Sequence, residues 1–431
     1  MRTTNDLVYG ERDSNAILVR RKSYEFFLRK QNIVRRAKRL VSNKPQPKTP
    51  YTLVILGVDT QEELSEFIEK CRWYLPTGLQ SYEIIIQHPI TKESESIISH
   101  DSRIKLARST ASYYSKAELI LINKQALLSS LKLLLFFDKM LIIDKHYFSV
   151  YESVEWQNMY FNSLTNQDRQ HFTELSIANF RRYQEEKSSK ERAFCFVTGP
   201  SFSLYNEFSY NSNDLIVICN SIVKNQEFLA TVGRVDLLTF ADSVFHFSFN
   251  EYASKFREGM LETFRRYHCF IAVPMQVFPL MYHHYPELRD YLIGMVLQHE
   301  HETDQYNIPS ETAFWVRDTA NILTLLMLPL AAAVTDTVHI IGADGRKPEE
   351  KYFWTHNPTV QFNDLMHAVF EGHPSFFRDR DYEDYYDMHC QHCHNLLTHA
   401  EKTGQQFISL TPSHIPAFKI RYRENLKSSI I

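Results

Sequence analysis

Glycine, long apolar runs and a surplus of charge of either sign are all scarce in this chain. Only 11 of its 431 residues are glycine, so the position of each one is informative. The net charge of −3 gives no general attraction to nucleic acid, and we expect no such partner. No run reaches the ~20 apolar residues that span a bilayer. Lys132 interrupts the run 127–137 and Pro329 interrupts the run 322–334, so we expect both to form buried helices.

Several sequence signatures are missing as well. The first half contains no G-x-G-x-x-G and no Walker motif, so nothing there predicts a dinucleotide or P-loop site. The six cysteines show no disulfide spacing, and the start lacks the apolar core of a signal peptide. These features favour a protein of the reducing cytoplasm, either soluble or peripheral at the inner face of the cell membrane.

The N-terminal segment, residues 1–48, is basic and ends in a proline-containing linker. Residues 20–44 hold ten Lys or Arg against one acid, Glu25, interleaved with aromatic and aliphatic residues. A basic amphipathic helix of this kind can lie on an anionic membrane surface. It can equally pack its apolar side on its own domain and leave its basic side in solvent.

Three further regions follow this segment. Residues 49–150 alternate short apolar runs with helical patterns, which is typical of a small Rossmann-like α/β domain, and Thr60 and Glu63 predict the capping box of its first helix. Residues 151–190 are typical of a helical bridge. Residues 191–431 show a second, larger α/β pattern. The first α/β domain fits acceptor binding or a simple packing role.

Four apolar runs of the second α/β region end in small or polar residues. The run 194–197 ends at Thr198-Gly199-Pro200-Ser201, where glycine permits unusual backbone angles and proline ends the ladder. The other three end at Asn220, at Ala241-Asp242-Ser243 and at Gly342-Ala343-Asp344-Gly345. Ligands of open α/β sheets bind beyond the carboxyl ends of parallel strands. We therefore expect these residues at one edge, facing an anionic or nucleotide group.

The order of these motifs resembles that of the bacterial lipooligosaccharide sialyltransferases and related families of the same fold, over about residues 192–420. In that family the strands end in Asn-Gly-Pro-Ser, Cys-Asn, Tyr-Asn and Ser-Gly-Ile-Asp. This chain has Thr-Gly-Pro-Ser, Cys-Asn, Ala-Asp and Ile-Gly-Ala-Asp. Thr198 and Asp242 replace Asn, which leaves the nucleotide contacts and the donor open. The resemblance implies two Rossmann-like domains, of which 191–431 is the catalytic one.

The resemblance also implies roles for single residues. The family opens a helix with Thr-Ser-Gly, which touches the nucleotide sugar, and Thr319 and Asn321 match it without its Ser. The family's general base is a His in an Ile-Gly-His context, which His373 matches best, with His356 as the second candidate. Tyr352 matches a tyrosine that holds the leaving phosphate. The remaining predicted nucleotide contacts are Gly199, Pro200, Ser201, Asn220, Asp242 and Asp344.

Two histidine-rich segments invite a metal assignment. Residues 280–310 contain His283, His284, His299 and His301 but no H-E-x-x-H, and we interpret them as an exposed lid or acceptor-recognition insertion. Residues 389–394 mix His and Cys without a second ligand pair, so helix packing explains them better. We expect no metal ion and no cofactor other than the donor substrate itself.

The implied function is a glycosyltransferase. It would move sialic acid or a related ulosonic acid from a CMP-activated donor to a saccharide or glycolipid acceptor, as in lipopolysaccharide or capsule synthesis. Two alternatives stay open. One is an enzyme resembling the hydroxymethylpterin pyrophosphokinase-like family, which shares the Gly-Pro-Ser turn. The other is a non-catalytic partner in envelope polysaccharide assembly.

Overall fold

The computed structural model describes most of the chain: residues 22, 26–27, 30–31, 50–78, 80–124, 131–146, 152–299, 303–347, 356–378 and 382–424. Most of the basic segment 20–44 lies outside these residues, so its membrane assignment stays a prediction. Tyr352, the predicted phosphate contact, also lies outside the described residues.

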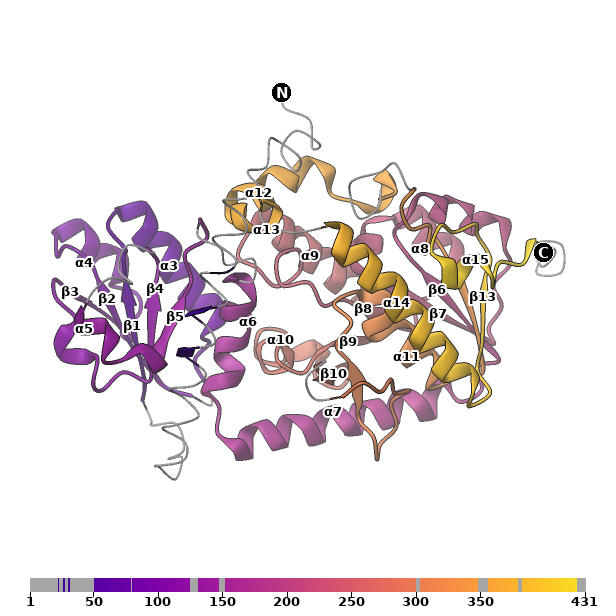
Figure 1. Cartoon of the computed structure of the whole chain (residues 1–431), viewed down its shortest axis with the longest axis horizontal. Helices are drawn as coiled ribbons and strands as arrows, with labels where there is room; N and C mark the ends of the chain where they lie inside the picture. Colours follow the sequence, from indigo (N-terminus) through magenta and orange to yellow (C-terminus); the bar gives the residue numbers. More distant parts are fainter. Residues whose placement is uncertain are drawn as a thin grey trace. The chain divides into compact units, whose positions relative to one another are not determined.

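The chain divides into two compact units (Figure 1). The small unit holds residues 1–170, 247–250 and 367–380, and the large unit holds 171–246, 251–366 and 381–431. The division thus falls inside helix α7 (Asn166–Lys187), earlier than the expected boundary near residue 190. Residues 367–380, which the sequence places in the catalytic domain, belong to the small unit. They are held there because His373 bonds to Glu152 and the Ser375 amide donates to the Lys145 carbonyl.

The small unit contains a five-stranded sheet in the order β3-β2-β1-β4-β5, in which every pair is parallel. Its strands are β1 (Tyr51–Leu56), β2 (Tyr82–Gln87), β3 (Ile104–Ala107), β4 (Leu119–Ile122) and β5 (Met140–Ile142). Its helices are α3 (Gln61–Tyr74), α4 (Lys92–Ile98), α5 (Leu131–Leu134), α6 (Glu152–Ser163), α12 (Met366–Gly372) and α13 (Pro374–Arg378). The predicted capping box is confirmed, because Thr60 and Glu63 bond to each other's backbone amides and start α3.

The large unit contains an eight-stranded parallel sheet in the order β11-β10-β9-β8-β7-β6-β12-β13. Its strands are β6 (Arg192–Phe196), β7 (Asp214–Cys219), β8 (Leu237–Thr239), β9 (Phe270–Pro274), β10 (Leu292–Gln298), β11 (Trp315–Arg317), β12 (Thr337–Ile341) and β13 (Gln406–Ser409). Side chains of β6 and β7 such as Phe194 and Val217 are fully buried, as expected for a sheet covered on both faces. The expected α/β architecture is confirmed.

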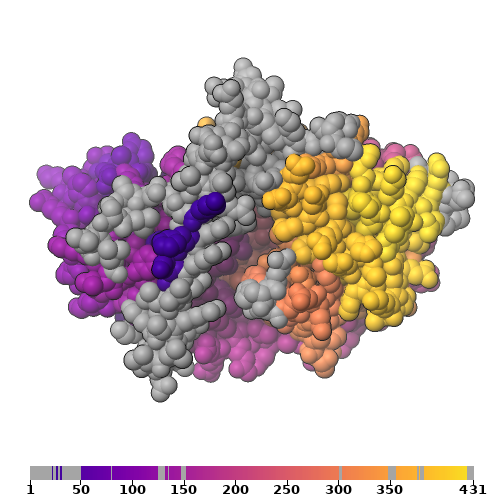
Figure 2. Space-filling view, viewed as in Figure 1, coloured from indigo at the N-terminus to yellow at the C-terminus, as the bar shows by residue number. Residues whose placement is uncertain are grey.

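The helices of the large unit are α8 (Gln226–Val232), α9 (Glu251–Tyr267), α10 (Phe278–His284), α11 (Leu328–Ala332), α14 (Tyr382–Glu401) and α15 (Pro416–Lys419), with part of α7. The gold helix α14 alternates buried and exposed positions, and its outer side is visible in Figure 2. Among the described residues, no helix combines the length and the apolar character that a membrane crossing requires.

Two expectations for the large unit need correction. Residues 280–310 are not simply an exposed lid, because they contain β10, whose first residues Leu292 and Ile293 are fully buried beside β9. The expected helix 322–334 is present but begins as a π-helix, Leu323–Met327, before α11. Pro329 is the second residue of α11, which directly follows this π-helix.

Candidate functional site

The strand order of the large sheet reverses between β6 and β12. From β6 the chain adds β7 to β11 on one side, and it later adds β12 and β13 on the other. In open α/β sheets such a reversal marks the crevice in which ligands bind, beyond the carboxyl ends of the two strands that flank it, here β6 and β12. The turns 198–201 and 342–345 follow these two strands. Both were predicted as site segments, and they lie next to each other at this edge.

Gly199 is required by the close approach of the two turns. Its amide donates to the Gly342 carbonyl at 3.0 Å. A Cβ on Gly199 would lie 2.2 Å from Asp344 Oδ2 and 2.4 Å from Gly342 O, distances too short for any side chain to fit at this position. Gly342 has a φ of 84° and would place a Cβ 2.2 Å from the Val197 carbonyl. Glycine therefore serves here to pack two turns together.

The carboxylate of Asp344 bonds directly to the Gly-Pro-Ser turn. The Ser201 amide donates to both of its oxygens at 3.1 Å, and Ser201 Oγ donates to Oδ2 at 2.9 Å. Burial raises the pKa of Asp344, and the bonds from Ser201 oppose this increase without cancelling it. The sequence suggested that the turn amides face an anionic ligand. In this structure the Ser201 amide binds the chain's own carboxylate instead.

His356 is attached to the same turn. Its Nδ1 lies 2.8 Å from Thr198 Oγ1, and the amide of the next residue, Asn357, donates to the Thr198 carbonyl at 2.8 Å. The Asn357 side chain also donates to the Pro200 carbonyl. Burial lowers the pKa of His356 to about 4, so the imidazole is neutral at pH 7 and a weak base in this state.

Asn220 stands at the carboxyl end of β7, beside the turn of β6. Its φ is 49°, a left-handed conformation that asparagine tolerates better than most residues. Its side-chain oxygen Oδ1 is buried, and no hydrogen-bond partner for it is found among the described residues. A buried carbonyl oxygen without a donor is costly in a folded protein, and such atoms often mark a place that a ligand or water completes.

Asp242, Thr319 and Asn321 make local bonds. Asp242 Oδ1 accepts from the amides of Val244 and Phe245, so this carboxylate caps its own turn. Asn321 Oδ1 accepts from the Leu323 amide at the start of the π-helix. The hydroxyl of Thr319 accepts from Thr324 Oγ1 at 2.9 Å. These bonds give the three residues a structural role in turns and at a helix start. Their nucleotide contacts stay predictions.

His373, the first candidate for the base, belongs to the small unit. It is 7% exposed, and its Nδ1 lies 3.0 Å from Glu152 Oε2. Lys70 approaches the other oxygen of Glu152 at 3.7 Å and contacts Glu66 at 2.7 Å. Burial raises the pKa of Glu152, but the charges and bonds of Lys70 and His373 outweigh it and leave this pKa below its usual value. Within its unit His373 is thus part of a buried ion-pair cluster.

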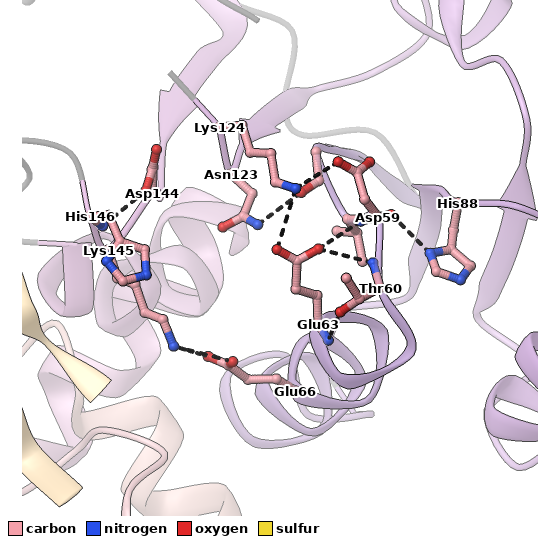
Figure 3. Close-up of polar contacts among 12 residues, drawn as sticks. Asp59, Thr60, Glu63, Glu66, His88, Asn123, Lys124, Asp144, Lys145 and His146 are labelled. Atoms are coloured by element: carbon pink, nitrogen blue, oxygen red, sulfur yellow. Dashed lines mark hydrogen bonds and ion pairs between the residues drawn. The ribbon is translucent and has the colours of Figure 1, made fainter. Parts of the chain in front are cut away.

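The carboxyl edge of the small sheet carries a second set of charged residues (Figure 3). Lys124, which follows β4, bonds to Asp59 at 2.6 Å and approaches Glu63 at 3.5 Å. Lys145, which follows β5, reaches Glu66 at 3.4 Å. These charges pair with one another, as expected for a packing domain, and an acceptor-binding role for this domain stays a prediction.

Sequence reasoning missed two residues at the edge of the large sheet. Arg346 follows the turn that carries Asp344, and its guanidinium carbon lies 4.8 Å from the ring centroid of Tyr386 on α14. Arg346 could have been found from the sequence, because it directly follows the strand-end Gly-Ala-Asp-Gly. Its contact with Tyr386 could not, because 40 residues separate the two in sequence.

The histidine and cysteine residues of α14 pack inside the large unit. His389 and Cys393 lie one helical turn apart and are buried, with Sγ 3.6 Å from the His389 Nε2. His392 bonds through Nδ1 to the hydroxyl of Tyr306 at 2.7 Å. In the part of the chain that the structure describes, no three His, Cys, Asp or Glu side chains form a group that could hold a metal. The predicted metal independence remains to be measured.

Comparison with known proteins adds no family: no family model, no curated protein and no solved structure matches this chain.

Proposed function

We propose that the large unit binds a CMP-activated acidic sugar, sialic acid or a related ulosonic acid, and transfers the sugar to a saccharide acceptor. The observation that carries the proposal is the buried, unpartnered Oδ1 of Asn220 at the carboxyl end of β7, one strand from the crevice between β6 and β12. A cytosine amino group or a ribose hydroxyl is the kind of donor that would satisfy this oxygen. The motif order supports the same assignment.

The transfer requires a base near the crevice, and His356 is the candidate that the contacts favour. Its bond to Thr198 fixes the imidazole on the Gly-Pro-Ser turn. In the proposed step the acceptor hydroxyl oxygen forms a bond to the anomeric carbon, its proton passes to His356, and the bond from that carbon to the phosphate oxygen breaks, releasing CMP. His373 was the first choice from sequence, but its bond to Glu152 gives it a structural role within the small unit.

A pKa of about 4 is low for a base, and the donor itself can correct this. The phosphate and the sugar carboxylate bring negative charge to the crevice, and a nearby anion raises the pKa of an imidazole. We therefore expect the pKa of His356 to rise when CMP binds. NMR titration of the imidazole with and without CMP measures this change, and an unchanged pKa would remove His356 from the proposed step.

Thermal unfolding with a panel of CMP, UDP, GDP and ATP tests the proposal. A ligand at 100 times its Kd should stabilise the protein by ~2.7 kcal/mol, so CMP is expected to raise Tm clearly. Asn220→Ala should reduce the CMP effect, while Asn213→Ala, in an exposed loop of the same unit, should not. Stabilisation by ATP alone would favour the pterin pyrophosphokinase-like alternative. No response to any nucleotide would refute the transferase and favour a non-catalytic role.

A further inference from the structure

We propose that Arg346 is the phosphate-binding residue of the large unit and forms a bidentate ion pair with the phosphate of the nucleotide. The inference rests on the proposed function and deepens it, because neither the motifs nor the resemblance assigns this residue. It starts from the question of which group neutralises the phosphate. The Ser201 amide and hydroxyl, the first candidates, already donate to Asp344.

The position of Arg346 follows from Gly345. Gly345 has a φ of 71°, and a Cβ there would lie 2.6 Å from the Tyr386 hydroxyl and 2.7 Å from Ile415 Cγ1. Only glycine allows this approach, which brings the chain against α14. The Arg346 amide then donates to the Tyr386 hydroxyl at 3.2 Å, and the guanidinium lies over the ring. Tyr386 thus contacts both the backbone amide and the guanidinium of Arg346, directly after the turn 342–345.

The charge of Arg346 is not neutralised by a carboxylate among the described residues. Two other partly buried arginines of the large unit do pair with a carboxylate: Arg192 bonds to Asp214 at 2.7 Å, and Arg421 bonds to Glu401 at 2.6 Å. Arg346 is also half-buried, and its guanidinium lies over the ring of Tyr386. A ring face attracts a guanidinium but leaves its N–H groups available in the plane.

An oriented guanidinium of this kind suits a phosphate. Its planar fork donates two parallel N–H···O bonds to two phosphate oxygens, which a lysine cannot do, and stacking on an aromatic ring lowers the entropy lost when the bonds form. The ligand class is therefore a nucleotide with at least one phosphate. The location, directly after the β12 turn, places this contact at the same edge as Asn220, where the base or ribose would bind.

Isothermal titration of CMP and cytidine separates phosphate binding from nucleoside binding. Wild type should bind CMP at least about tenfold more tightly than cytidine, and Arg346→Gln should remove this difference while leaving cytidine affinity unchanged. Arg346→Lys should restore only part of it, because the charge returns without the fork. Arg289→Gln is the matched control, since Arg289 also stacks on a tyrosine, at 4.6 Å from the Tyr282 ring, elsewhere in the unit.

The outcomes distinguish this inference from the proposed function. If Arg346→Gln binds CMP as wild type does, the inference is wrong and the transferase proposal survives. If wild type ignores CMP but binds ATP and loses that binding in Arg346→Gln, the inference holds and the proposed function fails. If wild type binds neither nucleotide, both fail. If Arg346→Gln without ligand melts well below wild type, Arg346→Lys is compared with wild type instead. A Lys variant that binds CMP as tightly as wild type would contradict the bidentate pair.

Discussion

The buried cluster around Glu152 predicts a large and pH-dependent loss of stability on substitution. Glu152 is 3% exposed and Lys70 is 8% exposed, so neither charge is solvated. At their separation of 3.7 Å the attraction is about 4.5 kcal/mol with an effective dielectric constant near 20. Breaking one partner of a buried pair costs ~3–5 kcal/mol. Because Lys70 keeps Glu66 at 2.7 Å, we expect Glu152→Gln to lose about 3 kcal/mol, the lower end of that range.

The pH dependence has a definite sign. The pKa of Glu152 is lower in the folded protein than its ordinary value of 4.5, so its contribution is fully present above that value. It is lost as the pH falls through the folded pKa. The difference in unfolding free energy between wild type and Glu152→Gln should therefore be largest near neutral pH and shrink below about pH 4.

Urea unfolding followed by tryptophan fluorescence provides the measurement, because Trp156 stacks on Tyr74 within this cluster. Glu69→Gln is the control, since Glu69 pairs with Arg72 on the exposed side of the same helix α3 and should cost less than ~1 kcal/mol. A loss in Glu152→Gln no larger than that of the control, or one that is equal at pH 7 and pH 3.5, would refute this account of the cluster.

Three other outcomes follow from the site. His356→Ala should lower turnover about 10²- to 10⁴-fold with CMP binding retained; His373→Ala should destabilise the protein and leave turnover of the folded enzyme intact, and full activity of both variants would remove both histidines from the mechanism. Gly199→Ala should destabilise the protein by ~2 kcal/mol or more, because its Cβ would lie 2.2 Å from Asp344. The control Gly233→Ala has no atom within 4 Å of its Cβ and should show only the ~1 kcal/mol strain of its φ of 68°. Equal losses of unfolding free energy in urea would contradict the packing argument. Transferase activity should survive EDTA, and a loss that manganese restores would overturn the predicted metal independence.

The strands at the centre of the large sheet could be predicted from sequence because each one is a short apolar run with a clear end. Residues 215–219 are buried on both faces and stop at Asn220, so pattern and turn chemistry agree. Parallel pairing then brought the four predicted strand ends to one edge. Strands β10 and β11 could not be predicted in this way, because β11 is less apolar and β10 lies in a histidine-rich segment.

The partners of the site residues could not be predicted, because they depend on contacts between distant segments. Nothing near His373 in the sequence indicates Glu152, which is 221 residues away. The bond between Ser201 and Asp344 has the same character, with 143 residues between them. Sequence patterns identify which residues end strands, but a choice between ligand contact and internal hydrogen bond requires the folded chain.

The discontinuous make-up of the small unit has a consequence for synthesis on the ribosome. Its last stretch, 367–380, is synthesised only after most of the large unit, and this stretch supplies the histidine that bonds to Glu152. A nascent chain can assemble the five-stranded sheet early, whereas Glu152 gains this partner only after residue 373 has been synthesised. If the gene were divided between the two sheets, the first fragment would therefore lack residues 367–380 and the histidine that bonds to Glu152.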